Sequence, residues 1–125
     1  MPYTQKEFST PPPHPPAGTP ADSPTAKPWY SIAPGVWEYL LNESGERKAV
    51  LQWYEPNAAS TQTEPITHTY IEEVCILRGG LEDVSLAETW TIGCYAYRKP
   101  GMKHGPYRAT GEGCLQFVKV EPVDK

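Results

Sequence analysis

The chain has 125 residues, a formal net charge of −4 and 21% charged side chains. This length suits one domain with its own core, and the acidic balance offers no basic surface that could neutralise a phosphate backbone. No apolar run approaches the roughly 20 residues that span a bilayer, and residues 1–28 lack the apolar segment of a secretory signal. We therefore expect a cytoplasmic protein that binds neither nucleic acid nor membrane.

The first 28 residues contain nine prolines, which remove backbone donors and restrict the preceding residue to extended geometry. We predict an extended, polyproline-like or disordered arm. It would lie over the folded domain or over a dimer mate, and we expect His14 within it to be solvated. The folded domain is predicted to comprise residues 29–125, because aromatic and aliphatic side chains become dense from Trp29 onward.

Short segments with strand character follow one another along residues 29–125. Residues 36–41 and 48–54 flank a polar turn and predict a hairpin, residues 55–65 predict a loop, and residues 81–91 predict a strand pair. Residues 93–99 and 114–120 predict further strands, with a hairpin turn at residues 108–113, where Gly111 and Gly113 lie. Without a helical period, this pattern predicts an all-β sandwich or barrel.

The three cysteines Cys75, Cys94 and Cys114 cannot all pair with one another, and each falls within a predicted strand. We therefore expect free cysteines that pack in the core rather than a disulfide framework.

Potential metal ligands gather in the stretch from Thr67 to Gly80 and in residues 101–105, which contain His104. Because alternate residues of a strand share a face, His68, Tyr70 and Glu72 point the same way in an unbroken strand. A bulge near Ile71–Glu72 would instead bring Glu73 to the face of His68 and would turn Cys75 and Leu77 inward.

These residues resemble the two motifs of the cupin superfamily. In the first motif His68, Glu73 and Gly80 match, with Tyr70 in the place of a second His; in the second motif Gly93, Gly101 and His104 match, with Lys99 in the place of a Pro. The flanking stretches PGVWEYLL and HGPYRATGEG are similar to small ChrR-like cupins. The resemblance covers residues 29–120 and implies a single-domain cupin, that is, a small β-barrel or jelly roll, preceded by the Pro-rich arm.

The resemblance favours Glu73 as the inward carboxylate and implies that His68, Glu73 and His104 hold one metal ion. Two imidazoles and a carboxylate inside a dry barrel are costly unless they coordinate an ion or bond one another. Such a ligand set suits Fe²⁺ or Zn²⁺, and Mn²⁺, Ni²⁺ and Cu²⁺ occupy similar sites. Tyr70 would be a weak fourth ligand, or a hydrogen-bond donor or general acid beside the metal. The alternative is a metal-free network of hydrogen bonds among the same side chains.

Several further side chains are candidates for contact with a small-molecule substrate. Aromatic residues suit a flat, apolar or phenolic ligand, although they also serve as simple core in a small barrel. Arg98 shares a strand face with Cys94 and Ala96 and would bind a carboxylate or enolate oxygen if that face is the interior, or be solvated if it is not. The predicted substrate-binding residues are Tyr70, Arg98, Trp53, Tyr97 and Tyr107.

Three functions are consistent with these features. The first is a metal-dependent dioxygenase that cleaves a carbon–carbon bond of an enolisable or phenolic molecule, as the resemblance to acetylacetone-cleaving cupins implies. The second is a redox-neutral lyase, isomerase, cyclase or decarboxylase in which Glu73, Tyr70 and His104 move protons with or without metal. The third is a cupin that binds a small molecule without catalysis. The resemblance also implies a homodimer.

Overall fold

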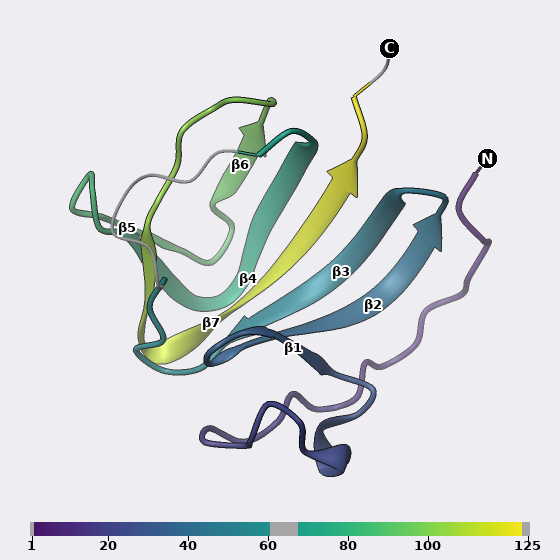
Figure 1. Ribbon diagram of the computed structural model, residues 1–125, viewed down its shortest axis with the longest axis horizontal. Helices are drawn as coiled ribbons and strands as arrows, with labels where there is room; N and C mark the ends of the chain where they lie inside the picture. Colours follow the sequence, from purple (N-terminus) through teal and green to yellow (C-terminus); the bar gives the residue numbers. More distant parts are fainter. Residues whose placement is uncertain (1, 61–67, 124–125) are drawn as a thin grey trace.

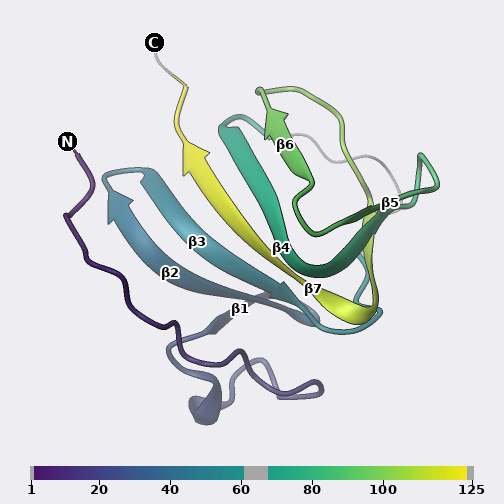
Figure 2. The same cartoon turned by 180° about the vertical axis from the view of Figure 1, so that it is seen from behind.

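The computed structural model describes residues 2–60 and 68–123. They form one antiparallel sheet with the strand order β1-β2-β3-β7-β4-β5, and β6 pairs with β4 (Figures 1 and 2). The strands are β1 (Tyr30–Ala33), β2 (Val36–Ser44), β3 (Arg47–Tyr54), β4 (Ile71–Asp83), β5 (Glu88–Thr91), β6 (Tyr95–Arg98) and β7 (Tyr107–Glu121), after one 3₁₀ turn, η1 (Pro24–Ala26). The predicted all-β fold is confirmed. Part of the predicted loop at residues 55–65, together with Thr67, lies outside the described residues.

Two long strands at the centre of the sheet bend together. β4 has 13 residues and β7 has 15, and their pairing shifts register between Ile76 and Arg78 and again between Gly79 and Leu81. Gly79 and Gly113 face each other at this bend with φ angles of 74° and 76°. A Cβ atom on Gly79 would stand 2.0 Å from the carbonyl oxygen of Gly113, so the close approach needs glycine. The predicted hairpin turn at residues 108–113 is therefore wrong, because this glycine-rich stretch curves within one continuous strand.

The curled sheet has an outer and an inner apolar face. On the outer face Trp37, Leu51 and Trp53 form a core cluster with Trp29 and Ala26. Two further clusters, with Val50, Val74 and Val118 in one and Ile76, Leu81, Tyr107, Ala109 and Cys114 in the other, contain the inward residues of β3, β4 and β7. All three cysteines are free, as expected, but only Cys114 is fully buried; Cys75 and Cys94 are partly buried, and Cys94 lies just before β6 rather than within a strand. Within the part of the chain that the structure describes, no helix has the length and apolarity to cross a membrane.

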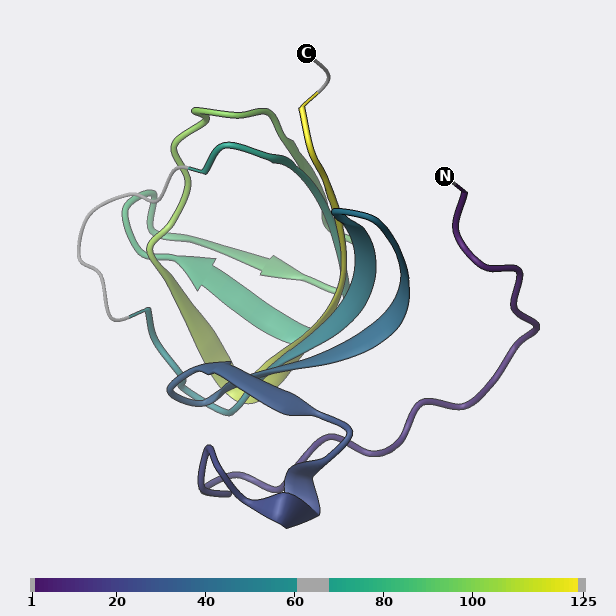
Figure 3. The ribbon, with the colours of Figure 1, turned by 45° about the vertical axis from the view of Figure 1, so that its right-hand side comes forward.

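The Pro-rich arm lies along the outer face, beside β1 and β2 (Figure 3). The His14 ring stacks on Trp53 with 3.8 Å between centroids, and its Nε2 contacts the Arg78 guanidinium at 3.0 Å. The indole N–H of Trp29 donates to the carbonyl of Pro12 at 2.9 Å. The expectation that His14 is solvated is therefore wrong, because its ring packs on Trp53 and contacts Arg78. The division between residues 1–28 and 29–125 stays a prediction.

Candidate metal centre

The imidazoles of His68 and His104 lie close together because hydrogen bonds connect the backbone segments that carry them. His68 lies three residues before the start of β4, and its carbonyl oxygen accepts a hydrogen bond of 3.0 Å from the N–H of Gly101. His104 lies in the segment between β6 and β7. The Asp83 carboxylate at the end of β4 accepts from the Gly105 N–H at 3.3 Å, and the Ser85 hydroxyl donates to the Gly105 carbonyl at 3.0 Å. The turn after β4 therefore holds the segment that carries His104.

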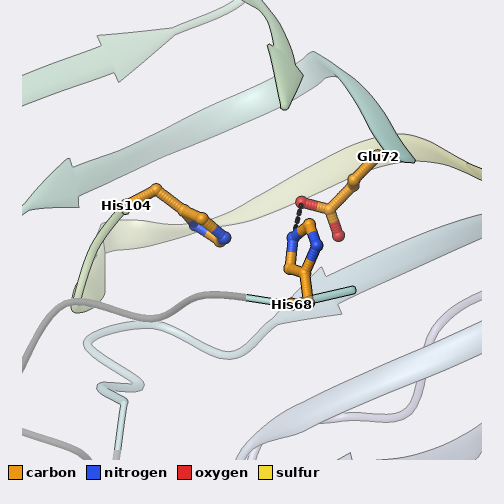
Figure 4. Close-up of side chains that lie close together, drawn as sticks. All are labelled: His68, Glu72 and His104. Atoms are coloured by element: carbon orange, nitrogen blue, oxygen red, sulfur yellow. Dashed lines mark ion pairs between the residues drawn. The ribbon is translucent and has the colours of Figure 1, made fainter. Parts of the chain in front are cut away.

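His68, Glu72 and His104 form a cluster in which one ligand atom from each lies within 4.8 Å of the others (Figure 4). The imidazole centroids are 5.0 Å apart, and His68 Nε2 lies 3.7 Å from Glu72 Oε1. The predicted convergence of His68 and His104 is therefore present in the structure.

The carboxylate of this cluster is Glu72, not Glu73. The pairing between β4 and β7 runs without a shift from Ile71 to Ile76, so the predicted bulge is absent there and Glu72 stays on the inward face. Glu73 points to the other face, where its carboxylate accepts from the Tyr95 hydroxyl at 2.8 Å. The prediction of Glu73 as the inward carboxylate is wrong, and Leu77 is 41% exposed rather than inward.

Each imidazole makes its hydrogen bond through Nδ1 and none through Nε2. His68 Nδ1 lies 3.0 Å from the Tyr70 carbonyl oxygen; because a carbonyl only accepts, Nδ1 carries the proton and Nε2 keeps its lone pair. His104 Nδ1 contacts the Tyr107 hydroxyl at 2.9 Å. Among the described residues, both Nε2 atoms are buried and have no hydrogen-bond partner. Buried polar atoms without partners are rare in folded proteins.

Arg98 connects Glu72 with Tyr107, the residue that contacts His104. Its guanidinium donates to Glu72 Oε1 at 2.7 Å and to the Tyr107 hydroxyl at 2.6 Å. Its side chain is 11% exposed, so its strand face is the interior. Burial, helped by the Arg98 charge, lowers the pKa of His104 to about 4, and burial raises the pKa of Tyr107 to about 12. Both groups are therefore neutral at pH 7.

A cavity of about 230 Å³ adjoins the cluster, and Arg98, His104 and Tyr107 are among the residues that line it.

The other predicted substrate-binding residues do not line this cavity. Trp53 packs on the outer face and Tyr97 is 47% exposed on the outward side of β6, so neither lines the cavity and both predictions fail for this site. Tyr70 is not part of the lining either; its ring stacks on His68 with 4.1 Å between centroids, and burial followed by the Glu72 charge raises its pKa.

Sequence reasoning missed two polar residues of the cavity lining, Asp83 and Gln116, which are each 5% exposed. The signal for Gln116 was available, because it alternates with Cys114 and Val118 on the inward face of β7. A glutamine between two buried apolar residues on one strand face indicates a polar group that needs a partner inside the barrel.

The donor set fits a divalent metal ion. Neutral imidazole nitrogen and carboxylate oxygen are ligands of Zn²⁺ and Fe²⁺, and ligand atoms on one such ion lie about 3–4 Å apart. The ligand atoms in the cluster lie within 4.8 Å of one another, so small side-chain rotations would complete the set. The hydrogen bonds to both Nδ1 atoms are the supports that metal-binding histidines usually have.

A curled antiparallel sheet with two histidines and a carboxylate inside defines the cupin class of protein. The family model described as the ChrR cupin-like domain matches residues 21–124, and the chain belongs to this family. No curated protein sequence matched the chain.

Solved structures resemble this fold at low sequence identity. An RmlC-like cupin from Shewanella frigidimarina is 17% identical, with a TM-score of 0.63, and the match covers 78% of this chain and 85% of that one. The complex of Rhodobacter sphaeroides SigE with the anti-sigma ChrR matches at 22% identity and TM-score 0.61, over 74% of this chain and 49% of the matched chain. KdgF from Halomonas sp. matches at 16% identity and TM-score 0.59, over 77% and 87%. This chain thus spans about half of the chain matched in the ChrR complex.

Proposed function

We propose that this protein is a metal-dependent cupin enzyme in which His68, Glu72 and His104 hold one divalent ion, with Fe²⁺ or Zn²⁺ favoured. The observation that carries the proposal is the pair of buried imidazole Nε2 atoms that, among the described residues, have no hydrogen-bond partner and lie beside the Glu72 carboxylate. Such atoms would be costly without an ion. The adjoining cavity would bind a small enolisable or phenolic molecule, and dioxygenase-type carbon–carbon cleavage is the favoured reaction.

The side chains around the cavity have defined roles in this proposal. When bound, the ion would act as a Lewis acid toward the oxygen atoms of the substrate. Arg98 orients Glu72 and Tyr107 at once and places a positive charge beside the bound molecule, where it would stabilise an enolate or phenolate oxygen. The neutral imidazole of His104 remains available as a ligand because protonation is disfavoured in this buried place. The apolar part of the wall, which includes Val74 and Ile76, would contact the hydrocarbon part of the bound molecule.

A redox-neutral lyase, isomerase, cyclase or decarboxylase is the second candidate. It is supported by the Tyr107 hydroxyl, which contacts both His104 Nδ1 and Arg98 and can pass a proton between the cavity and the imidazole. In that reaction Glu72 would take the part that was predicted for Glu73. The polyketide cyclase RemF from Streptomyces resistomycificus has a similar fold, at 18% identity and TM-score 0.56 over 72% of this chain and 66% of that one.

The metal proposal is tested by elemental analysis of protein purified without chelator. We expect His68→Ala, Glu72→Gln and His104→Ala to lose the ion, since each removes a ligand atom of the cluster. Glu73→Gln is the matched control, because it changes the neighbouring carboxylate that points to the other face. Unchanged metal content in both histidine variants would overturn the site, and loss of metal in Glu73→Gln alone would transfer the carboxylate role to Glu73.

The reaction classes are separated by measuring oxygen uptake with acetylacetone and catechol as enolisable and phenolic probes. Uptake by the wild-type protein that His104→Ala abolishes supports the dioxygenase. Turnover of either probe under nitrogen supports the redox-neutral candidate. Binding with no turnover in either gas would leave a cupin that only binds small molecules. A homodimer and a cytoplasmic location stay predictions.

A further inference from the structure

A row of three polar side chains crosses the inner face of the sheet and ends at the cavity. Glu38 on β2 lies opposite Gln52 on β3, and Gln52 lies opposite Gln116 on β7. Glu38 is 3% exposed and Gln116 is 5% exposed. Polar groups this deeply buried are stable only when hydrogen-bonded, so the direction of each bond in the row matters.

The carboxylate at one end of the row determines the direction of every bond. The Glu38 carboxylate accepts from Lys48, with which it forms a salt bridge of 2.9 Å, and from the Tyr30 hydroxyl. Because a carboxylate only accepts, Gln52 must present its NH₂ group to Glu38, and it does so at 3.1 Å. The Gln52 carbonyl oxygen therefore faces Gln116, whose NH₂ group donates to it at 2.9 Å.

Gln116 is left with its carbonyl oxygen Oε1 buried and, among the described residues, without a hydrogen-bond partner. Gln116 lines the same cavity as Arg98 and His104. Exchanging the oxygen and nitrogen of the Gln116 amide would not give Oε1 a donor, because Oε1 would then face the carbonyl oxygen of Gln52. Two other buried side chains of the lining could accept: Asp83 is already engaged by the Ser85 hydroxyl and by backbone N–H groups, and His104 Nε2 is assigned to the ion in the proposed function.

We infer that Gln116 Oε1 is the acceptor for a hydroxyl group of the bound molecule, so that the cavity selects a phenol or enol over an ether or ketone of the same shape. This inference adds a ligand contact to the proposed function. It rests on that proposal in one respect, namely that the small molecule binds in this cavity. A cavity of about 150 Å³ holds benzene, and this one measures about 230 Å³. A ring that carries a hydroxyl group fits, with its hydrocarbon part against Ile76 and Leu81.

The test compares phenol with anisole, in which a methyl ether replaces the hydroxyl donor. Dissociation constants are measured by NMR titration of the full chain, both treated with chelator and loaded with zinc. Phenol should bind the wild-type protein about tenfold more tightly than anisole, the value of roughly one neutral hydrogen bond. In Gln116→Met, which removes the acceptor, phenol and anisole should bind with about equal affinity, whereas Glu73→Gln, which changes a carboxylate on the other face, should keep the preference.

A second measurement on the wild-type protein covers the case in which Gln116→Met fails to fold. The ¹³Cδ resonance of Gln116 should move on addition of phenol and stay in place with anisole at equal saturation. Equal affinity for both probes, or a preference that survives in Gln116→Met, would overturn the inference. The measurements on chelator-treated protein keep this outcome separate from the metal proposal. If the wild-type protein binds no zinc but still prefers phenol, the ion is rejected and the Gln116 subsite stands.

Discussion

Replacing Arg98 by methionine should destabilise the metal-free protein and make it more responsive to metal. Arg98 is the cation that contacts Glu72 in the cluster, and the two side chains are 11% and 14% exposed. Removing one partner of a buried ion pair leaves the other charge uncompensated, which costs about 3–5 kcal/mol. Because both side chains keep some contact with water, we expect about 3 kcal/mol, at the lower end of that range.

The assay is thermal unfolding in EDTA and then with added zinc. At about 4 °C per kcal/mol for a chain of this length, Arg98→Met should melt roughly 12 °C below the wild-type protein in EDTA. Zinc should raise the melting temperature of the variant more than that of the wild type, because the ion would supply the missing positive charge beside Glu72.

A surface ion pair provides the matched control for this experiment. Lys119 and Glu121 lie 3.3 Å apart with both side chains 36% exposed, and Lys119→Met should cost less than about 1 kcal/mol. If Arg98→Met melts no lower than Lys119→Met in EDTA, Glu72 does not depend on Arg98 and the electrostatic reasoning is wrong. A zinc response equal to that of the wild type would separate Arg98 from the metal site.

Three further predictions concern the bend and the buried titratable groups. In urea titrations, Gly79→Ala and Gly113→Ala should each lower the unfolding free energy by several times the roughly 1 kcal/mol cost of a positive φ. Gly111→Ala should have little effect, because an added Cβ there would have no neighbour within 4 Å. Burial raises the pKa of Cys114 to about 12; its thiol should resist iodoacetamide at pH 8 until the protein unfolds, and its contribution to stability should be lost as pH rises from 9 toward 12. The pKa of His104 falls to about 4, so NMR in EDTA should show a neutral imidazole at pH 5, and stability should decrease as pH falls from 6.5 toward 4, since the unfolded chain takes up the proton first.

Local patterns were sufficient for the hairpin of β2 and β3 and for both histidines. Alternation in residues 48–54 and the polar turn before them specify a hairpin because side-chain direction in a strand repeats every two residues. His68 and His104 were identified because each occupies a fixed place in a cupin motif. Proline density was likewise sufficient to predict an extended arm, since proline excludes helix and central strand.

The sequence by itself thus determined the all-β class and two of the three clustered side chains. Only the tertiary structure decided between Glu72 and Glu73, because inward direction depends on whether β4 stays in register with β7, and the first shift occurs after Ile76. It also decided that Gly113 bends a strand instead of ending it, because Gly113 lies against Gly79 of another strand. Contacts between residues far apart in the chain settle such questions, and no local pattern contains them.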